Sequence, residues 1–536
     1  MTQNTSNRVL IVGWDGADWR ILEPMLRKGQ LPALGRLISE GVSGPLRSTI
    51  PTHSYTAWAS FMTGKNPGKH GIYAFMSRRD PAHGGRALTI DRRSIVGESF
   101  IEALARHGRT VGTAHVPLTF PPVPLNGFWI SGMVIPEGAT YTHPPELQPL
   151  IEGYAGSAFG EDVLWNRIPG NWERLFDISE TVAEAHARGF LYLLDRLAWD
   201  VFTYVFVSPD RLQHVVMRLL DESHPEYDAE LSQRYMPRVV EHFQMLDRAL
   251  GEAVARVGED TLVLLISDHG FRACWRDWSA ADWLRQRGYL RVRRDWRKLR
   301  QLLRKPVQAL VHSPEKREAM ATLGSRLLRD DLDWKRTQAY VASVSEHGIR
   351  VNLEGREPLG VVPQSRYEEF RKQMRAEILA LRDPDSGEPL VREVYMREEL
   401  FYGDKLGDAP DLVFELATGI GAPSTPSGNS HVMPSGWKSG EHDPEGILVA
   451  HGPHVPRGRR LANAHLIDIA PTVLHVMGVP IPDDMDGVFL EGMFAGADFD
   501  PIQFETPWAA EVEQGIYSDE EQDLIEDHLR SLGYLD

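Results

Sequence analysis

The chain has 536 residues, which exceeds a single ordinary compact core and predicts a large domain that carries insertions or a second lobe. Its 42% hydrophobic and 25% charged residues are typical of a soluble globular protein, and no stretch approaches the roughly 20 apolar residues that a membrane span requires. One cysteine, Cys274, excludes an intrachain disulfide and a cysteine-rich zinc site, and a net charge of -17 disfavours long nucleic acids as partners.

The N-terminal segment and the apolar runs after it indicate location and fold class. Met1 to Asn7 is short and polar and lacks the apolar stretch of a signal peptide, so we expect a cytoplasmic protein. Continuous apolar runs occur at Val9 to Val12, Thr110 to Val116, Val201 to Val207, Leu262 to Ile266 and Ile447 to Ala450. Runs without polar alternation are typical of strands buried on both faces. We therefore predict an α/β fold with a mostly parallel central sheet flanked by helices on both faces.

Two segments near the N-terminus carry candidate polar groups. Asp15 follows the first apolar run, within Gly13 to Gly16, where on its own it could mark a turn into a helix. Ser54 lies in the hydroxyl-rich segment Ser48 to Trp58, which leads into Thr63 to Gly71. Its hydroxyl could be one of several helix N-caps. Alternatively, it could be a nucleophile at a helix N-terminus, where backbone N–H groups favour an anionic phosphoryl group.

Two more candidate pairs follow later apolar runs. Asp210 and His214, four residues apart, would share one face if their segment is helical. Asp268 and His269 follow another run, and adjacent residues of a strand face opposite ways. Both can reach one centre only where the strand has ended and the chain bends, as Gly270 permits. Because open α/β sheets place ligand sites at the carboxyl ends of strands, these segments point towards one crevice.

The sequence pattern changes between residues 275 and 415, where we expect an inserted α+β cap or lid. It begins with the basic segment 285–305, whose charges could form a solvated helix face or attract an anionic substrate. Residues 1–274 and 416–490 would form the discontinuous, metal-dependent catalytic core. Within it, His442 is expected in a loop just before the last core strand, and in isolation would be a surface histidine.

Two C-terminal helices are predicted from their end signals. Asp468 to Met477 has helical apolar spacing and is followed by Gly478. Residues 491–536 are expected to form a C-terminal extension. Its packing helix would run from Ser518 to Leu532, with Ser518 and Glu521 as a capping box.

Together these segments resemble the alkaline phosphatase superfamily, and within it the type I phosphodiesterase/nucleotide pyrophosphatase group. The resemblance covers their order and local sequence over roughly Arg8 to Gly487. It implies that one metal is held by Asp210, His214 and His442. A second metal would be held by Asp15, Asp268 and His269, with Ser54 beside it as the nucleophilic hydroxyl and a further metal-contacting group.

Metal chemistry favours this implied division. Three histidine or carboxylate ligands per metal leave positions for substrate and water. Such ligands suit zinc and also admit manganese or iron. One metal would activate the Ser54 hydroxyl for attack on phosphorus, and the other would stabilise the leaving oxygen. A phosphoserine intermediate is therefore expected.

The substrate is predicted less directly. The diesterase branch usually has threonine where Ser54 stands, and Ala57 replaces an asparagine that contacts phosphate in nucleotide pyrophosphatases. A diester carries one negative charge, which two metals and a helix N-terminus can balance. A monoester dianion needs a further cation, for which these segments offer Lys65 and Lys69. We therefore expect a small, nucleotide-like diester, with Lys65 and His70 as candidate substrate-binding residues.

Three alternatives stay open at this point. A phosphomonoesterase, phosphonate hydrolase or phosphotransferase would use the same fold. A dinucleotide-binding protein is suggested by Val9 to Gly16, but the Gly-x-Gly-x-x-Gly fingerprint is absent. A metal-free binding module conflicts with the complete ligand set. A sulfatase is excluded because Ser54 to Trp58 lacks the required proline and arginine. The sequence fixes neither the natural substrate nor the oligomeric state.

Overall fold

The computed structural model describes residues 8–77, 87–133, 135–136, 138–292, 332–342, 347–423, 430–496, 499–508, 517 and 519–532. Its centre is a ten-stranded sheet in the order β17-β2-β16-β7-β1-β6-β3-β4-β5, with β18 also paired to β2. Their bounds are β1 (Arg8–Trp14), β2 (Val42–Arg47), β3 (Val111–Ala114), β4 (Gly127–Ile130), β5 (Thr142–His143), β6 (Val201–Phe206), β7 (Thr261–Ile266), β16 (Glu445–His451), β17 (Arg459–Arg460) and β18 (Ala464–His465). Strands β7, β1, β6, β3 and β4 are parallel neighbours, and β16 runs antiparallel between β2 and β7. The predicted mostly parallel α/β sheet is confirmed.

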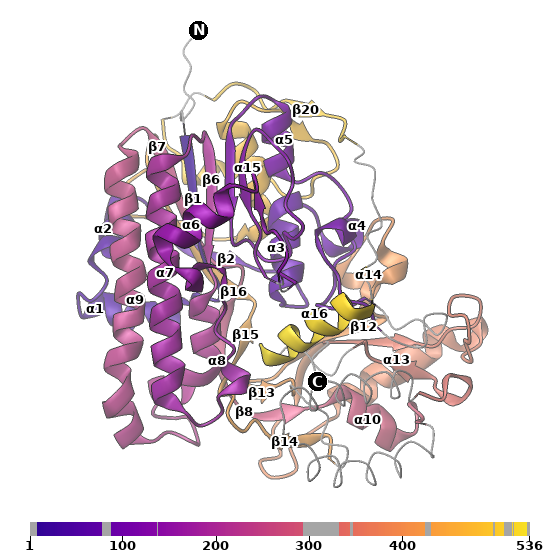
Figure 1. The fold of residues 1–536 in the computed structure, drawn as a ribbon. Helices are drawn as coiled ribbons and strands as arrows, with labels where there is room; N and C mark the ends of the chain where they lie inside the picture. The colour runs from indigo at the N-terminus through magenta and orange to yellow at the C-terminus, as the bar shows by residue number, and fades with distance from the viewer. Residues whose placement is uncertain are drawn as a thin grey trace.

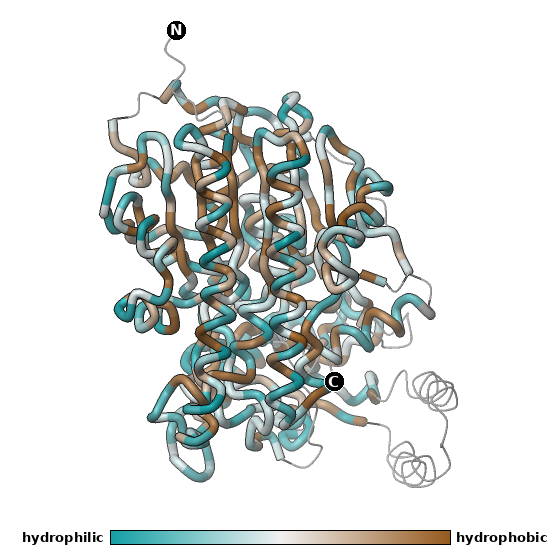
Figure 2. The backbone as a smooth tube through the Cα atoms, turned by 60° about the vertical axis from the view of Figure 1, so that its left-hand side comes forward, coloured by the Kyte–Doolittle hydropathy of each residue, from teal (hydrophilic) through white to brown (hydrophobic). Residues whose placement is uncertain are grey.

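Helices cover both faces of this sheet (Figure 1). Successive residues of β1 serve two hydrophobic cores, with Leu10 and Val12 in one and Val9 and Ile11 in the other. The first core is closed by α1 (Trp19–Arg27), α2 (Pro32–Glu40), α6 (Leu147–Ala155), α7 (Trp172–Arg196), α8 (Ser208–Leu220) and α9 (Ala229–Val257). The second is closed by α3 (Ser54–Thr63), α5 (Phe100–Arg106) and α15 (Ile469–Val476). In Figure 2 the long helices covering one face alternate between hydrophilic and hydrophobic residues, because only one side of each helix is buried.

A second body begins where β8 (Gly270–Trp278) leaves the core. One of its sheets has the order β11-β12-β10-β9, and another joins β13 and β14 to β8, with β15 also paired to β8. Its elements are α10 (Ala280–Arg287), β9 (Ala339–Tyr340), β10 (Gly348–Val351), α13 (Tyr367–Leu379), β11 (Val391–Met396), α14 (Arg397–Leu400), β12 (Leu412–Leu416), β13 (Gly419–Gly421), β14 (Val432–Pro434) and β15 (Gly440–Asp443). A separate hydrophobic core, which includes Trp283 and Phe414, supports our proposal of an inserted cap. Of the basic segment 285–305, residues from 293 onward lie outside the described residues.

The C-terminal helix α16 (Asp519–Ser531) lies between the core and the cap (Figure 1). Its Ile525 and Leu529 are buried in a hydrophobic cluster with Tyr55 and Met133 of the core and Ala342 of the cap. The predicted capping residue, at position 518, lies outside the described residues. Besides several 3-10 helices, the remaining short elements are α4 (Pro67–His70), β19 (Ile481–Pro482) and β20 (Phe504–Glu505). Within the described part of the chain, no helix combines the length and apolarity that crossing a membrane would need.

Candidate metal centre

Three parallel strands end beside one another and deliver most of the predicted ligands. Asp15 follows β1, Asp210 lies in the first turn of α8 just after β6, and Asp268 follows β7. Both β6 and β7 are hydrogen-bonded to β1, so the three carboxylates emerge at one edge of the sheet. Each is at most 1% exposed. His214 lies one helical turn after Asp210, as its spacing predicts, and is also buried.

The remaining two positions come from outside this edge. Ser54 is the first residue of α3, as expected for a group at a helix N-terminus. His442 was expected in a loop, and that expectation is wrong. It belongs to β15, which pairs antiparallel with β8 so that His442 lies opposite Phe271, and it is 6% exposed. This strand is formed by backbone pairing with β8. The local sequence, which has no strand periodicity, therefore could not predict it.

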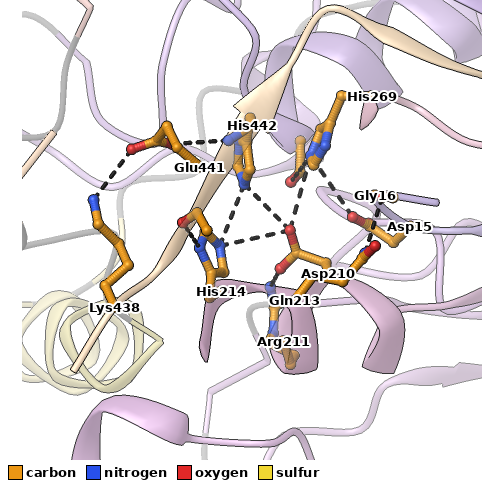
Figure 3. Close-up of polar contacts among 12 residues, drawn as sticks. Asp15, Gly16, Asp210, Arg211, Gln213, His214, His269, Lys438, Glu441 and His442 are labelled. Atoms are coloured by element: carbon orange, nitrogen blue, oxygen red, sulfur yellow. Dashed lines mark hydrogen bonds and ion pairs between the residues drawn. The ribbon is translucent and has the colours of Figure 1, made fainter. Parts of the chain in front are cut away.

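The side chains converge on Asp210 and His269 (Figure 3). Asp210 Oδ1 lies 3.2 Å from His442 Nε2, 3.6 Å from His214 Nε2 and 3.9 Å from His269 Nε2. His269 Nε2 lies 3.3 Å from Asp268 Oδ2 and 3.8 Å from Asp15 Oδ1. The six predicted histidine and carboxylate ligands therefore share one buried cluster.

Two groups of side chains within this cluster could each hold a metal ion. In each group the ligand atoms lie within 4.8 Å of one another; one is Asp210, His269 and His442, and the other is Asp15, Asp268 and His269. His269 thus faces both groups, whereas the resemblance assigns it to one. His214 stands at the edge of the first group, with its Nε2 3.3 Å from that of His442.

All three histidines are oriented by backbone carbonyls. His214 Nδ1 donates to Gly440 O at 3.2 Å, His269 Nδ1 to Gly270 O at 3.1 Å and His442 Nδ1 to Thr52 O at 3.0 Å. A carbonyl only accepts, so each Nδ1 carries the hydrogen, and Nε2 is the ring nitrogen that faces the cluster and can bind a metal in the neutral form. A hydrogen bond from the far ring nitrogen is the usual arrangement of a metal-binding histidine.

The electrostatics of the cluster favour a bound cation. Burial, together with repulsion from Asp268 and Asp210, raises the pKa of Asp15 well above its ordinary value. Burial and the charge of Asp210 raise the pKa of Asp268 to about 7. Burial also opposes ionisation of Asp210, but neighbouring positive charge, including that of Arg211, outweighs it and holds the pKa of Asp210 well below its usual range.

Two carboxylate oxygens give a direct test of fit. Asp15 Oδ1 and Asp268 Oδ2 are buried and accept no hydrogen bond from any described residue. Buried polar atoms without a partner are costly, and three acidic groups in one dry pocket repel each other. A divalent cation would bind both oxygen atoms and offset the repulsion between the carboxylates. The residues present therefore fit a metal ion.

Several supporting contacts were missed from the sequence. Trp58 Nε1 donates to Asp15 Oδ2 at 3.0 Å, and the Gly16 amide donates to Asp268 Oδ1 at 3.2 Å. The His442 amide donates to Glu441 Oε1 at 3.0 Å. Trp58 follows Ser54 by one helical turn, and that spacing is a signal that could have identified it.

Gly270 has a different role from the predicted one. The chain bends at Asp268, and Gly270 already begins β8. A Cβ at Gly270 would lie 2.1 Å from Glu445 O and 2.3 Å from Asp18 Oδ2. The glycine is needed because backbone and carboxylate approach it closely, rather than for an unusual backbone angle.

Ser54 lies against the cluster at the start of α3. Its Oγ lies 3.3 Å from His269 Nε2, and its side chain is buried. The helical hydrogen bond from Ala57 N to His53 O is the first of α3. The amides that precede it are not used within the helix and can bind an anion.

Lys65 and His70, the predicted substrate-binding residues, are not brought to the cluster. Both follow the C-terminal end of α3, whose ten residues span about 15 Å from Ser54. Lys65 pairs with Asp484, and His70 Nε2 bonds to Ser60 Oγ at 2.8 Å. Burial, with the charge of Lys65, lowers the pKa of His70 to about 3. These side chains therefore pack α3 and α4 against the C-terminal part of the core, which corrects the prediction.

One family model and several solved structures are similar to this chain. The family model described as type I phosphodiesterase / nucleotide pyrophosphatase matches residues 9–445. The solved structure of phosphonoacetate hydrolase from Sinorhizobium meliloti, in complex with phosphonoformate, is 15% identical, with a TM-score of 0.50 over 87% of this chain and 94% of that one. Human ectonucleotide pyrophosphatase/phosphodiesterase 5 is 14% identical, with a TM-score of 0.48 over 91% of this chain and 100% of that one. No curated protein matches the chain.

Proposed function

Because this chain belongs to the type I phosphodiesterase/nucleotide pyrophosphatase family, we propose that it hydrolyses a phosphodiester or phosphoanhydride at a two-metal centre through a phosphoserine intermediate. One observation carries the proposal. Ser54 at the start of α3 lies beside a buried cluster in which three histidines turn their Nε2 atoms towards three carboxylates. Zinc is the proposed metal, since histidine with carboxylate suits it, and manganese or iron are the alternatives.

The chain's own residues would divide the work as follows. Asp15, Asp268 and His269 would hold one ion, and Asp210, His442 and His214 the other. Bound divalent ions would supply Lewis-acid stabilisation of the phosphoryl oxygens and of the ionised Ser54 hydroxyl. Ser54 Oγ would form a bond to phosphorus as the ester bond to the leaving group breaks. Water would then break the Oγ–P bond and restore Ser54.

The charges around the cluster support a diester rather than a monoester. Four basic side chains near α3 or the cluster already pair with acids: Lys65 with Asp484, Lys69 with Asp486, Arg211 with Asp210 and Asp162, and Lys438 with Glu441 and Asp277. A monoester dianion needs more positive charge than a singly charged diester. Metals and the α3 N-terminus can balance one negative charge.

Substrate and metal measurements test this proposal together. Elemental analysis of gently purified protein should give close to two equivalents of metal. The kcat/KM for bis-p-nitrophenyl phosphate should exceed that for p-nitrophenyl phosphate. Phosphonoacetate belongs in the same screen, because the S. meliloti protein of similar fold is named as its hydrolase.

Two results would contradict the proposal at different levels. A monoester preference above about tenfold, worth roughly 1.4 kcal/mol in transition-state binding, would overturn the diester assignment alone. Protein without metal, and without activation by added zinc, manganese or iron, would overturn the two-metal centre.

A further inference from the structure

Arg211 is a buried cation beside the proposed metal centre that the mechanism above does not use. Its side chain is 1% exposed. Nε and Nη2 donate to Oδ1 and Oδ2 of Asp162, both at 3.0 Å, and Nη1 donates to Asp210 Oδ2. One guanidinium thus joins a carboxylate outside the centre to a proposed metal ligand; Figure 3 shows its contact with Asp210.

This contact divides the two oxygens of Asp210 between different partners. Oδ2 receives the charge-assisted hydrogen bond from Arg211. Oδ1 is the oxygen that faces His442 Nε2 at 3.2 Å and His214 Nε2 at 3.6 Å. Because Asp162 meets the planar guanidinium with two parallel hydrogen bonds, Arg211 is itself fixed in orientation when it donates to Oδ2 of Asp210. Asp210 is therefore held with one defined oxygen towards the histidines.

The sign of the charge shows that simple attraction cannot be the role of Arg211. A positive group this close to a cation site would by itself repel a divalent ion. Asp162 offsets that repulsion, since it is only 9% exposed and meets the guanidinium with both oxygens. The remaining role of Arg211 is to fix orientation. Asp162 holds Arg211 in place, and Arg211 holds Asp210.

We propose that Asp162 and Arg211 are positioning residues which make Asp210 offer a single oxygen, Oδ1, to the metal that it binds. The inference rests on the proposed metal centre and adds to it two residues that the family resemblance does not assign. Neither residue contacts the substrate in this proposal. They act on metal affinity and coordination, and on turnover only through these.

Zinc affinity and the visible spectrum of the Co²⁺-loaded protein test this inference without relying on turnover. Arg211→Met should weaken zinc binding about 10- to 100-fold at one of two sites, the range typical when a group orienting a metal ligand is lost. It should also change the Co²⁺ spectrum, because Asp210 becomes free to offer both oxygens. Arg211→Gln, which keeps one donor towards Asp210, should recover part of the affinity. Asp162→Asn should weaken binding too, because it leaves the charge of Arg211 uncompensated.

Arg238→Met is the matched control. Arg238 makes an equally paired contact with Glu180, at 2.7 Å through both Nε and Nη2, but it joins α9 to α7 away from the centre. This variant should keep the zinc affinity and Co²⁺ spectrum of the wild type.

Three outcomes would overturn the inference. The first is Arg211→Met with zinc affinity within about threefold of wild type and an unchanged Co²⁺ spectrum. The second is tighter zinc binding in this variant, which would make repulsion the dominant effect. The third applies if Arg211→Met does not fold: it is an unchanged zinc affinity in both Arg211→Gln and Asp162→Asn. A wild-type protein that binds no metal would instead overturn the proposed function.

Discussion

At the scale of single residues, one hydrogen on each ring decides what the cluster can bind. His214, His269 and His442 each commit Nδ1 to a backbone carbonyl, which leaves Nε2 as an acceptor. Ser54 Oγ reaches this acceptor side at 3.3 Å from His269 Nε2. The chemistry thus depends on the ring orientation as much as on the residue types.

Replacing the proposed nucleophile should separate chemistry from metal binding. We expect Ser54→Ala to lower kcat by several orders of magnitude, because removing a covalent nucleophile costs far more than removing a helix cap. Metal content should stay close to that of the wild type, since six histidine and carboxylate ligands remain. Steady-state kinetics and elemental analysis of the same preparation measure both quantities.

Neighbouring hydroxyls provide the controls for this substitution. Thr52 Oγ1 donates to Thr49 O, and Thr56 is buried within α3. Thr52→Ala and Thr56→Ala should retain most of the turnover. Near-native turnover in Ser54→Ala, with activity abolished in either threonine variant, would show that the nucleophile has been misassigned.

At the scale of elements, strand ends and one strand pair assemble the cluster. Parallel β1, β6 and β7 bring three carboxylates to one edge of the sheet. The pairing of β15 with β8 places His442 beside them. The C-terminal helix α16 then packs on Tyr55, the residue next to Ser54, and on the cap residue Ala342. Core, cap and C-terminal helix therefore share one hydrophobic cluster close to the nucleophile.

Paired leucine substitutions in α16 test whether this helix is docked in solution. Leu529 is fully buried, whereas Leu524 is 46% exposed on the same helix. Leu529→Ala should lower the free energy of unfolding by about 2–5 kcal/mol, the usual cost of truncating a buried leucine. Leu524→Ala should change it by less than about 0.5 kcal/mol. Denaturant titration measures both, and equal effects would contradict the docked position of α16.

At the scale of the whole molecule, buried neutral histidines couple stability to pH. Three examples outside the proposed metal ligands show this: burial lowers the pKa of His186 and of His242 to about 4, and burial with the charge of Lys65 lowers that of His70 to about 3. Their ordinary value is 6.5. Below pH 6.5 these histidines are therefore protonated in the unfolded chain but stay neutral in the folded chain.

The sign of this difference predicts destabilisation by mild acid. The stabilising contribution is complete above pH 6.5 and is lost as the pH falls towards 4. Each such histidine should cost about 1.4 kcal/mol per pH unit within this window. In metal-free protein the raised pKa values of Asp15 and Asp268 act in the opposite direction, so denaturant midpoints at pH 7.5, 6 and 5 are compared between wild type and His242→Gln. Between pH 7.5 and 5, His242→Gln should lose less stability than the wild type, by the contribution of one proton, and an identical pH dependence of the two proteins would contradict the prediction.

The sequence alone determined the features that depend on local pattern. Continuous apolar runs such as Val201 to Val207 identified buried strands, because burial on both faces leaves no room for polar alternation. The spacing of Asp210 and His214 correctly predicted a shared helical face. The motifs around Ser54 and Asp268, taken with their order along the chain, identified the family.

Only the tertiary structure decided the features that depend on contacts between distant segments. His442 lies in a strand that only its partner strand forms. Its ring is oriented by the carbonyl of Thr52, which is 390 residues away in sequence. The same applies to the paired state of Lys65, whose partner Asp484 lies 419 residues away. Local sequence limits which backbone conformations a segment favours. Which buried charge meets which partner is set by the whole fold, because each must find an opposite charge or hydrogen bond wherever packing places it.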